Sequence, residues 1–245
     1  MAQLSVEAVT VRFRGNVAVN GVDLTAEPGC VTGLIGPNGA GKTTLFNVIT
    51  GLQQPTAGRV VLDGHDITKL PPFKRARKGI GRTFQRLELF SALTARENIR
   101  VAADIHRGWS SQRESPDDVA ERIIQRIGLN DVAEIRVDSL PTGQGRLVEL
   151  GRALATNPTV LLLDEPAAGQ DESETERFAN LLRELAGEGM AVLLVEHDVS
   201  LVMDVCSHIH VLDFGEIIAA GSPEEIRVND AVLAAYLGTP VEPTA

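Results

Sequence analysis

The chain reads Gly36-Pro37-Asn38-Gly39-Ala40-Gly41-Lys42-Thr43 and matches the pattern GxxxxGK[ST] at every fixed position. The short apolar run 31–35 precedes this segment, and apolar residues recur at helical spacing in 45–49. The order predicts a strand, a loop and a helix. Glycines let backbone N–H groups converge on phosphate oxygens, and the following helix presents its positive end. The segment therefore predicts a nucleotide-phosphate loop (P-loop) in an α/β fold, where an ordinary glycine turn is the alternative.

The side chains expected to complete a phosphate site come from two places. Lys42 would add a positive charge and Thr43 a ligand for Mg²⁺. A carboxylate is also needed on the metal side, and Asp164 follows the apolar run 160–163. Glu165, one residue further, could accept a proton from an attacking water, although a solvated surface acid fits its position equally well.

A histidine follows another apolar run. His197 comes shortly after 192–195, as expected for a polar group directed at a nucleotide. His208 and His210 alternate on a predicted strand, and we assign them no ligand role. Cys30 and Cys206 are far apart and form no CxxC pair, so we expect small buried thiols rather than metal or disulfide chemistry.

The composition limits the class of protein. With 245 residues, of which 43% are hydrophobic, the chain can bury one core and a subdomain. Its net charge of -10 has the wrong sign for a nucleic-acid partner. No apolar run approaches the roughly 20 residues that cross a bilayer, and the first residues do not resemble a signal peptide, so we expect a cytoplasmic protein.

The pattern changes along the chain. Alternating residues before the P-loop predict antiparallel strands, and 87–151 reads as helical, with Thr94 and Glu97 forming a capping box and Ser115 opening a second helix. Strands and helices then alternate again. We expect one helix to open at Ser173, with Glu176 three residues later, and a last short helix to be capped by Ser222.

In this order the motifs resemble those of the ATP-binding-cassette (ABC) transporter ATPases over almost the whole chain. The resemblance implies an α/β P-loop NTPase with a mixed central sheet, an antiparallel β subdomain and an α-helical subdomain. It implies a single nucleotide-binding domain over 1–245, with the ATPase core and β subdomain at 1–86 and 152–245. The helical subdomain, with the family's signature segment, would occupy 87–151.

The resemblance also implies roles for individual residues in binding and hydrolysing ATP with Mg²⁺. Phe13 would stack on adenine, and the P-loop would extend to Thr44. Gln85 would be the lid glutamine that touches Mg²⁺ and the water, and Asp171 would belong to the D-loop. Glu165 would act as the base with His197 as the switch histidine, and Mg²⁺ would be held by Thr43, Gln85 and Asp164.

The signature segment departs from the family sequence LSGGQ. It reads Leu140-Pro141-Thr142-Gly143-Gln144, with proline in place of the serine that contacts the γ-phosphate. Pro141 suits the first turn of a helix, and the N–H groups of Thr142 and Gly143 could still face an anion. Gln170 also stands where a leucine is usual in the D-loop.

By the same resemblance, two ATPase subunits, identical or different, close head to tail and bind transmembrane permease subunits at the cytoplasmic face of the membrane. The permease would dock near 87–105. The runs 81–85, 165–169 and 235–238 are similar to the branched-chain amino-acid importer branch, which implies a substrate-binding protein as an indirect partner. A lipid or polysaccharide exporter subunit, a soluble ABC-type ATPase and a non-hydrolysing regulator remain alternatives. A P-loop GTPase is disfavoured because no Asn-Lys-x-Asp run is present.

One basic run stands out in this acidic chain. It contains no acid, and we expect a solvated face, with a lipid surface or a permease loop as the alternative. Its members are Lys74, Arg75, Arg77, Lys78, Arg82 and Arg86.

Overall fold

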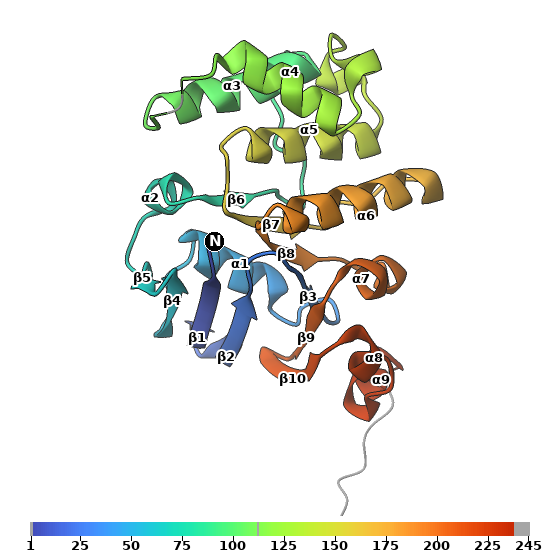
Figure 1. Cartoon of the computed structure of the whole chain (residues 1–245). Helices are drawn as coiled ribbons and strands as arrows, with labels where there is room; N and C mark the ends of the chain where they lie inside the picture. The colour runs from blue at the N-terminus through green and yellow to red at the C-terminus, as the bar shows by residue number, and fades with distance from the viewer. Residues whose placement is uncertain (1, 112, 238–245) are drawn as a thin grey trace, which may run out of the picture.

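The computed structural model describes residues 2–111 and 113–237, in which helices pack around two β-sheets (Figure 1). The strands are β1 (Leu4–Phe13), β2 (Asn16–Ala26), β3 (Val31–Ile35), β4 (Ala57–Leu62), β5 (His65–Asp66), β6 (Ile80–Arg82), β7 (Val160–Asp164), β8 (Ala191–Val195), β9 (His208–Asp213) and β10 (Glu216–Gly221). The helices are α1 (Lys42–Thr50), α2 (Pro72–Arg77), α3 (Ala95–Arg107), α4 (Pro116–Arg126), α5 (Thr142–Leu154), α6 (Glu172–Gly187), α7 (Val199–Val205), α8 (Pro223–Arg227) and α9 (Asp230–Leu237).

The central sheet has six strands in the order β10-β9-β3-β8-β7-β6, and only the pair of β10 and β9 is antiparallel among its described pairs. β3, β7 and β8 are buried along their whole length, as expected for parallel strands that are covered on both faces. Side chains alternate, so Leu161 and Leu163 join the core on one face and Val160 and Leu162 the core on the other. The parallel direction brings the carboxyl ends of β3, β7 and β8 to one edge.

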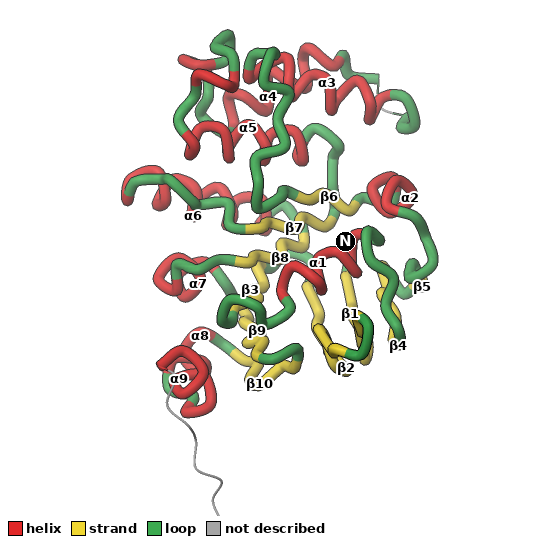
Figure 2. Tube along the Cα trace, turned by 180° about the vertical axis from the view of Figure 1, so that it is seen from behind, coloured by secondary structure: helices red, strands yellow, loops and turns green. Residues whose placement is uncertain are grey.

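The second sheet is antiparallel, as predicted, in the order β2-β1-β4-β5. Val6 pairs with Leu24 on one side and Val60 on the other, and all three side chains are buried. Figure 2 shows this sheet beside the ladder of central strands that runs from β6 to β10. β4 and β6 were not predicted, because β6 has only three residues and β4 begins with three exposed ones.

Helices α3, α4 and α5 form a separate layer above the central sheet (Figures 1 and 2). The capping box of Thr94 and Glu97 and the cap at Ser115 are confirmed. Ile99, Ile123 and Val148 bury their side chains between the three helices. This layer overlaps the predicted helical region, although α5 continues to Leu154 rather than ending at 151.

Two predicted helix starts differ from the structure. The helix expected to open at Ser173 begins at Glu172, and its capping box uses Asp171 and Glu174 instead of Ser173 and Glu176. The Asp171 carboxylate accepts a hydrogen bond from the Glu174 N–H at 2.8 Å. This bond satisfies one of the free N–H groups in the first turn, so the helix begins before Ser173. Pro141 lies at the N-cap of α5, one position before the first turn in which it was expected.

The prediction of a solvated face for the basic run was wrong for two of its members. Arg75 is fully buried, and its guanidinium donates to the carbonyl oxygens of Leu70, Val48, Ile49 and Thr68. Burial lowers the pKa of Arg75. The second is Arg82, which lies beside Asp164. Of the two thiols expected to be buried, Cys206 is buried and Cys30 is partly exposed.

Candidate functional site

The P-loop joins β3 to α1, and its backbone geometry requires glycine. Gly36 has φ 151°, and a Cβ there would lie 1.9 Å from the carbonyl oxygen of Leu212. Gly41 has φ 113° and is the N-cap of α1, where no side chain caps the helix. The first N–H groups of α1 are therefore left for another acceptor. The glycine at position 36 is explained by the close approach of the P-loop backbone to the backbone of Leu212.

Lys42 folds back over this loop. Its Nζ donates to the carbonyl oxygens of Gly36 at 2.6 Å and Pro37 at 3.0 Å. Burial lowers the pKa of Lys42, while the nearby carboxylates of Glu165 and Asp164 raise it. The Thr43 side chain is exposed in the first turn of α1. The Lys42 ammonium group, the Thr43 hydroxyl and the N-terminus of α1 therefore all lie at this loop.

Asp164 ends β7 and is only 2% exposed. Its carboxylate lies 3.3 Å from the guanidinium of Arg82, which also donates to the Asn47 side chain at 2.7 Å. Burial raises the pKa of Asp164, and Arg82 lowers it. Sequence reasoning missed this role of Arg82, because β6 and its pairing with β7 were not predicted.

Glu165, Gln85 and His197 meet at the carboxyl edge of the central sheet. The Oε1 atom of Glu165 accepts a hydrogen bond from Gln85 Nε2 at 3.1 Å and lies 2.7 Å from His197 Nε2. Glu165 has φ 50°, a strained backbone angle for this residue type. The three residues predicted for catalysis are therefore brought together from β7, the segment after β6 and the segment after β8.

A second glutamate supports this edge and was also missed. Glu196 is buried, and it accepts hydrogen bonds from the backbone N–H groups of Ala167 at 2.8 Å and His197 at 3.0 Å. Burial raises the pKa of Glu196, and these N–H donors lower it. The sequence signal that could have identified Glu196 was its position directly after β8 and before His197.

Helix α5 holds the segment that contains Gln85. Arg146 donates to the carbonyl oxygens of Phe84, at 2.6 Å, and Gln85. Glu149 accepts from the N–H of Phe84 at 3.3 Å, and it pairs with Arg146 at 3.2 Å. The sequence carried only a weak signal for this pair, namely an arginine and a glutamate three residues apart in the predicted helical region.

The signature residues do not join the P-loop within this chain. Thr142 and Gly143 start α5 beside the turn at Gly169, and Gln144 lines a cavity between α5 and α6. The Asp171 carboxylate caps α6. Among the described residues, none of the hydrogen bonds of these side chains reaches the P-loop.

Phe13 and the expected metal ligands are the remaining residues of the predicted site. The Phe13 ring is 47% exposed at the end of β1, as a stacking surface requires. No cluster of three or more His, Cys, Asp or Glu side chains in the described part of the chain could hold a metal ion. A metal at this edge would therefore rest on Asp164, the Thr43 hydroxyl, Gln85 and phosphate oxygens.

Similarity to known proteins agrees with this geometry. Residues 19–168 match the family model of ABC transporters, and 216–242 match that of branched-chain amino acid ATP-binding cassette transporters. The branched-chain amino acid transport ATP-binding protein BraF of Pseudomonas aeruginosa is 43% identical, over 96% of this chain and 97% of BraF. LivG of Escherichia coli, named in the same way, is 40% identical over the same shares. The lipopolysaccharide export ATP-binding protein LptB of Haemophilus influenzae is 35% identical over 97% of this chain and 98% of LptB.

Solved structures give the same result. A nucleotide-free ATP-binding cassette from an ABC transporter superposes with a TM-score of 0.86 at 33% identity, over 98% of this chain and 100% of that one. A dimeric cassette bound to ADP and Pi superposes with a TM-score of 0.81 at 28% identity, over 90% and 98% of the two chains.

No helix in residues 2–111 and 113–237 has the length and apolar character needed to cross a membrane. The chain belongs to the ABC transporter ATPase family, whose members bind and hydrolyse ATP to power transport, and it is similar to branched-chain amino acid transport ATP-binding proteins.

Proposed function

We propose that this chain is the motor subunit of an importer for branched-chain amino acids, bound to permease subunits at the cytoplasmic face of the membrane. The convergence of Gln85 and His197 on Glu165 beside the P-loop carries the ATPase part of the proposal. The match of 216–242 to branched-chain transporters and the similarity to BraF and LivG support the substrate class.

The proposal gives each of the residues at the site a role in ATP hydrolysis. The P-loop N–H groups and Lys42 bind the phosphates. Thr43, Gln85 and Asp164 would hold Mg²⁺, and the ion would offset the charge of the phosphate oxygens. Glu165 accepts a proton from the attacking water, and Gln85 and His197 orient its carboxylate from two sides. Positioning and charge stabilisation supply the catalysis.

A second ATPase subunit completes the site in this proposal. Thr142, Gly143 and Gln144 form hydrogen bonds to no P-loop residue of their own chain in its described part, and the N-cap Pro141 offers α5 no side-chain hydrogen bond. The first N–H groups of α5 are thus free to bind the phosphate held by a partner's P-loop. Asp171 would stabilise the facing turn. The dimeric cassette with ADP and Pi supports this arrangement.

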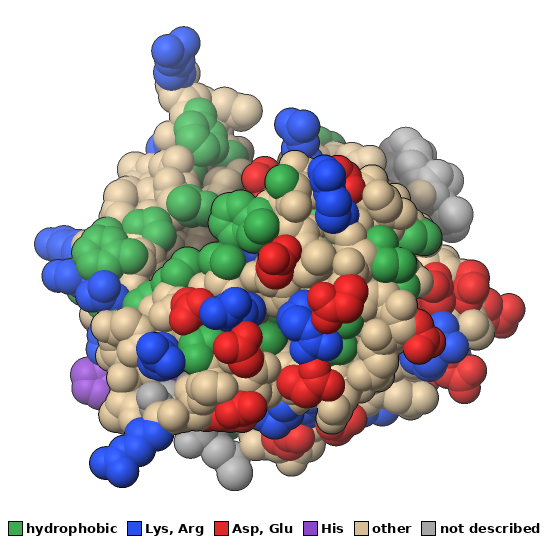
Figure 3. Space-filling view, turned by 90° about the horizontal axis from the view of Figure 1, so that it is seen from above, with side chains coloured by type: hydrophobic (Ala, Val, Ile, Leu, Met, Phe, Trp, Pro, Cys, Tyr) green, Lys and Arg blue, Asp and Glu red, His purple; other side chains and the backbone are tan. Residues whose placement is uncertain are grey.

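The permease is proposed to dock in a cleft between β6, α3 and α5. The cleft has a volume of about 270 Å³, and Phe84, Ile105 and Arg152 lie on its walls. Phe84 and Ile105 are exposed, and in the view from above hydrophobic side chains gather beside Lys and Arg side chains (Figure 3). An amphipathic helix end fits such a surface. A substrate-binding protein would act through the permease.

The similarity to LptB favours one second candidate, an ATPase subunit of a lipopolysaccharide exporter. Transport measurements separate the two candidates. In proteoliposomes that contain the cognate permease, an importer ATPase is stimulated by a substrate-binding protein loaded with L-leucine, whereas an exporter ATPase is stimulated by its lipid substrate.

The ATPase proposal is tested by steady-state hydrolysis with Mg²⁺ at a series of protein concentrations. We expect a rate that rises faster than linearly with concentration, and a loss of about 10²–10⁴-fold in Glu165→Gln, the range for removing a general base. Glu176→Gln, an exposed change of the same kind on α6, is the matched control and should keep the wild-type rate. A Glu165→Gln variant with the wild-type rate would assign the base to another group.

A further inference from the structure

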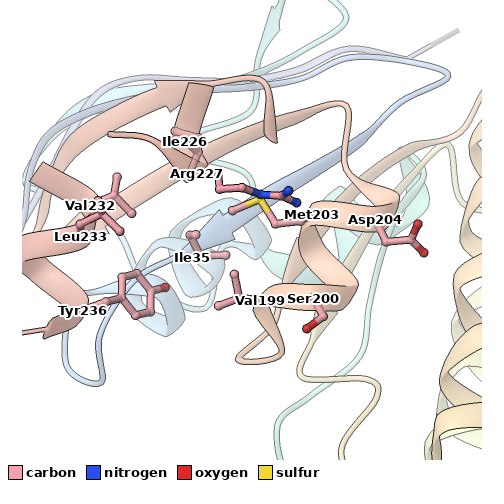
Figure 4. A pocket seen from close by; sticks show the side chains of 10 residues that line it. All are labelled: Ile35, Val199, Ser200, Met203, Asp204, Ile226, Arg227, Val232, Leu233 and Tyr236. Carbon is pink, nitrogen blue, oxygen red and sulfur yellow. The ribbon is translucent and has the colours of Figure 1, made fainter. Parts of the chain in front are cut away.

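A cavity of the size of a small-molecule site lies outside the ATP site, between α7 and the two C-terminal helices (Figure 4). Its volume is about 690 Å³, within the roughly 300–1,000 Å³ of sites that bind small molecules. Aliphatic side chains line most of it, among them Ile35, Met203, Ile226 and Val232. An apolar cavity of this size that remains open to solvent indicates a ligand with an apolar body.

One cation faces this cavity. Arg227 ends α8, and it lines the cavity together with Met203 (Figure 4). Within the described part of the chain, Arg227 forms no ion pair and donates no side-chain hydrogen bond. Its charge contributes to lowering the pKa of the exposed Glu224. A guanidinium with free donors is suited to bind a carboxylate.

The acid on the cavity wall is already paired. Asp204 on α7 lies 2.5 Å from Arg183 on α6, and its carboxylate points away from the other labelled side chains in Figure 4. The ammonium group of a free amino acid would therefore have no acidic partner inside the cavity. The arrangement favours an aliphatic anion over an amino-acid zwitterion.

The cavity also touches the ATP site. Ile35 is the last residue of β3 before the P-loop, and Val199 follows the His197 segment. The backbone of Gly36 interacts with the Tyr236 hydroxyl, which counteracts the rise in the Tyr236 pKa caused by burial. A molecule in the cavity would contact both segments that hold the phosphate site.

We propose that this cavity binds an aliphatic carboxylate, with its carboxylate on Arg227 and its chain against the apolar lining, and that occupancy changes the affinity of the P-loop for nucleotide. Two sources share this chemistry, a medium-chain fatty acid and a branched 2-oxo acid. The site does not depend on which substrate the transporter carries.

Isothermal titration calorimetry with the full chain tests the binding site. The probes are decanoate, below its micelle concentration, and 4-methyl-2-oxopentanoate, with 1-decanol and L-leucine as comparisons. We expect saturable binding of one carboxylate per chain, and binding at least about tenfold weaker for 1-decanol and L-leucine, which lack the anion or carry an unpaired ammonium. Binding of decanoate alone identifies the fatty-acid source, and binding of the oxo acid identifies the other.

Two variants and a control define the site. Arg227→Gln should weaken carboxylate binding at least about tenfold, and Leu233→Trp should weaken it by filling the cavity. Both positions are exposed, so the fold is kept. Arg122→Gln, the same change on the distant α4, should bind as wild type. No saturable binding, or equal binding by Arg227→Gln, would overturn the site.

The coupling has its own measurement. Linkage requires that the carboxylate change the Kd for ADP by the same factor as ADP changes the Kd for the carboxylate. We expect a factor of at least about 5 in both titrations, the lower end of the usual range of coupling between sites. An ADP Kd that stays constant at saturating carboxylate would overturn the coupling and leave an isolated binding site.

Discussion

The Arg82 side chain is the only described cation within ion-pair distance of Asp164, and both side chains are almost completely buried. Removing one partner of such a pair leaves a buried charge without compensation, so Arg82→Gln should lower the free energy of unfolding by about 3–5 kcal/mol. Urea unfolding measures this. Arg59→Gln breaks an exposed pair with Glu7 and should cost less than about 1 kcal/mol. Equal losses in the two variants would contradict a structural role for the buried pair.

His210 makes the stability of the fold depend on pH. Burial, and then the neighbouring His208, lower its pKa to about 4 from an ordinary value of 6.5. The unfolded chain therefore binds this proton more readily, and the folded state should lose up to about 3 kcal/mol as the pH falls from 6.5 to about 4. His210→Phe should flatten the pH dependence of unfolding in this window, whereas the exposed His65→Phe should not. A wild-type slope in His210→Phe would assign the effect to other groups.

At the scale of elements, α5 links the signature segment to Gln85, because Arg146 binds the backbone of Phe84 and Gln85. A shift of α5 therefore moves Gln85. Arg146→Gln should lower kcat by about 10- to 100-fold through misplacement of Gln85, with little change in the KM for ATP. The control is Arg107→Gln, at the end of α3. An unchanged kcat, or a loss confined to KM, would show that Gln85 is held by other contacts.

At the scale of the whole molecule, permease binding and ATP hydrolysis are proposed to use different surfaces. The permease would bind in the cleft between β6, α3 and α5. Ile105 is 54% exposed on its wall, whereas Ile135, 41% exposed, lies outside it. Ile105→Glu places a charge in the proposed interface and should reduce co-purification with the permease more than about tenfold. Ile135→Glu should have no such effect, and the isolated ATPase rate should stay constant in both. Normal assembly of Ile105→Glu would place the permease on another surface.

Local patterns predicted much of the site. The glycines of the P-loop, the polar residues after β7 and β8 and the caps at Thr94 and Ser115 each depend on a few neighbouring residues. Two parallel strands with carboxyl ends at one edge place Glu165 and His197 together, so their meeting follows from strand direction. The helix start at Ser173 was wrong because two acceptable caps lie close in the sequence, and the stronger acceptor, Asp171, took the position.

The sequence by itself determined the P-loop motif, the class of fold and the candidate residues for ATP hydrolysis, because glycine spacing and apolar periodicity are local properties. Only the tertiary structure decided which charges are buried and which partners they have. Arg82 meets Asp164 through the pairing of β6 with β7, and Arg146 meets Gln85 through the packing of α5. The cavity at Arg227 also arises only when α8 and α9 fold beside α7. Such pairings join residues far apart in the chain, so strand order and helix packing select them.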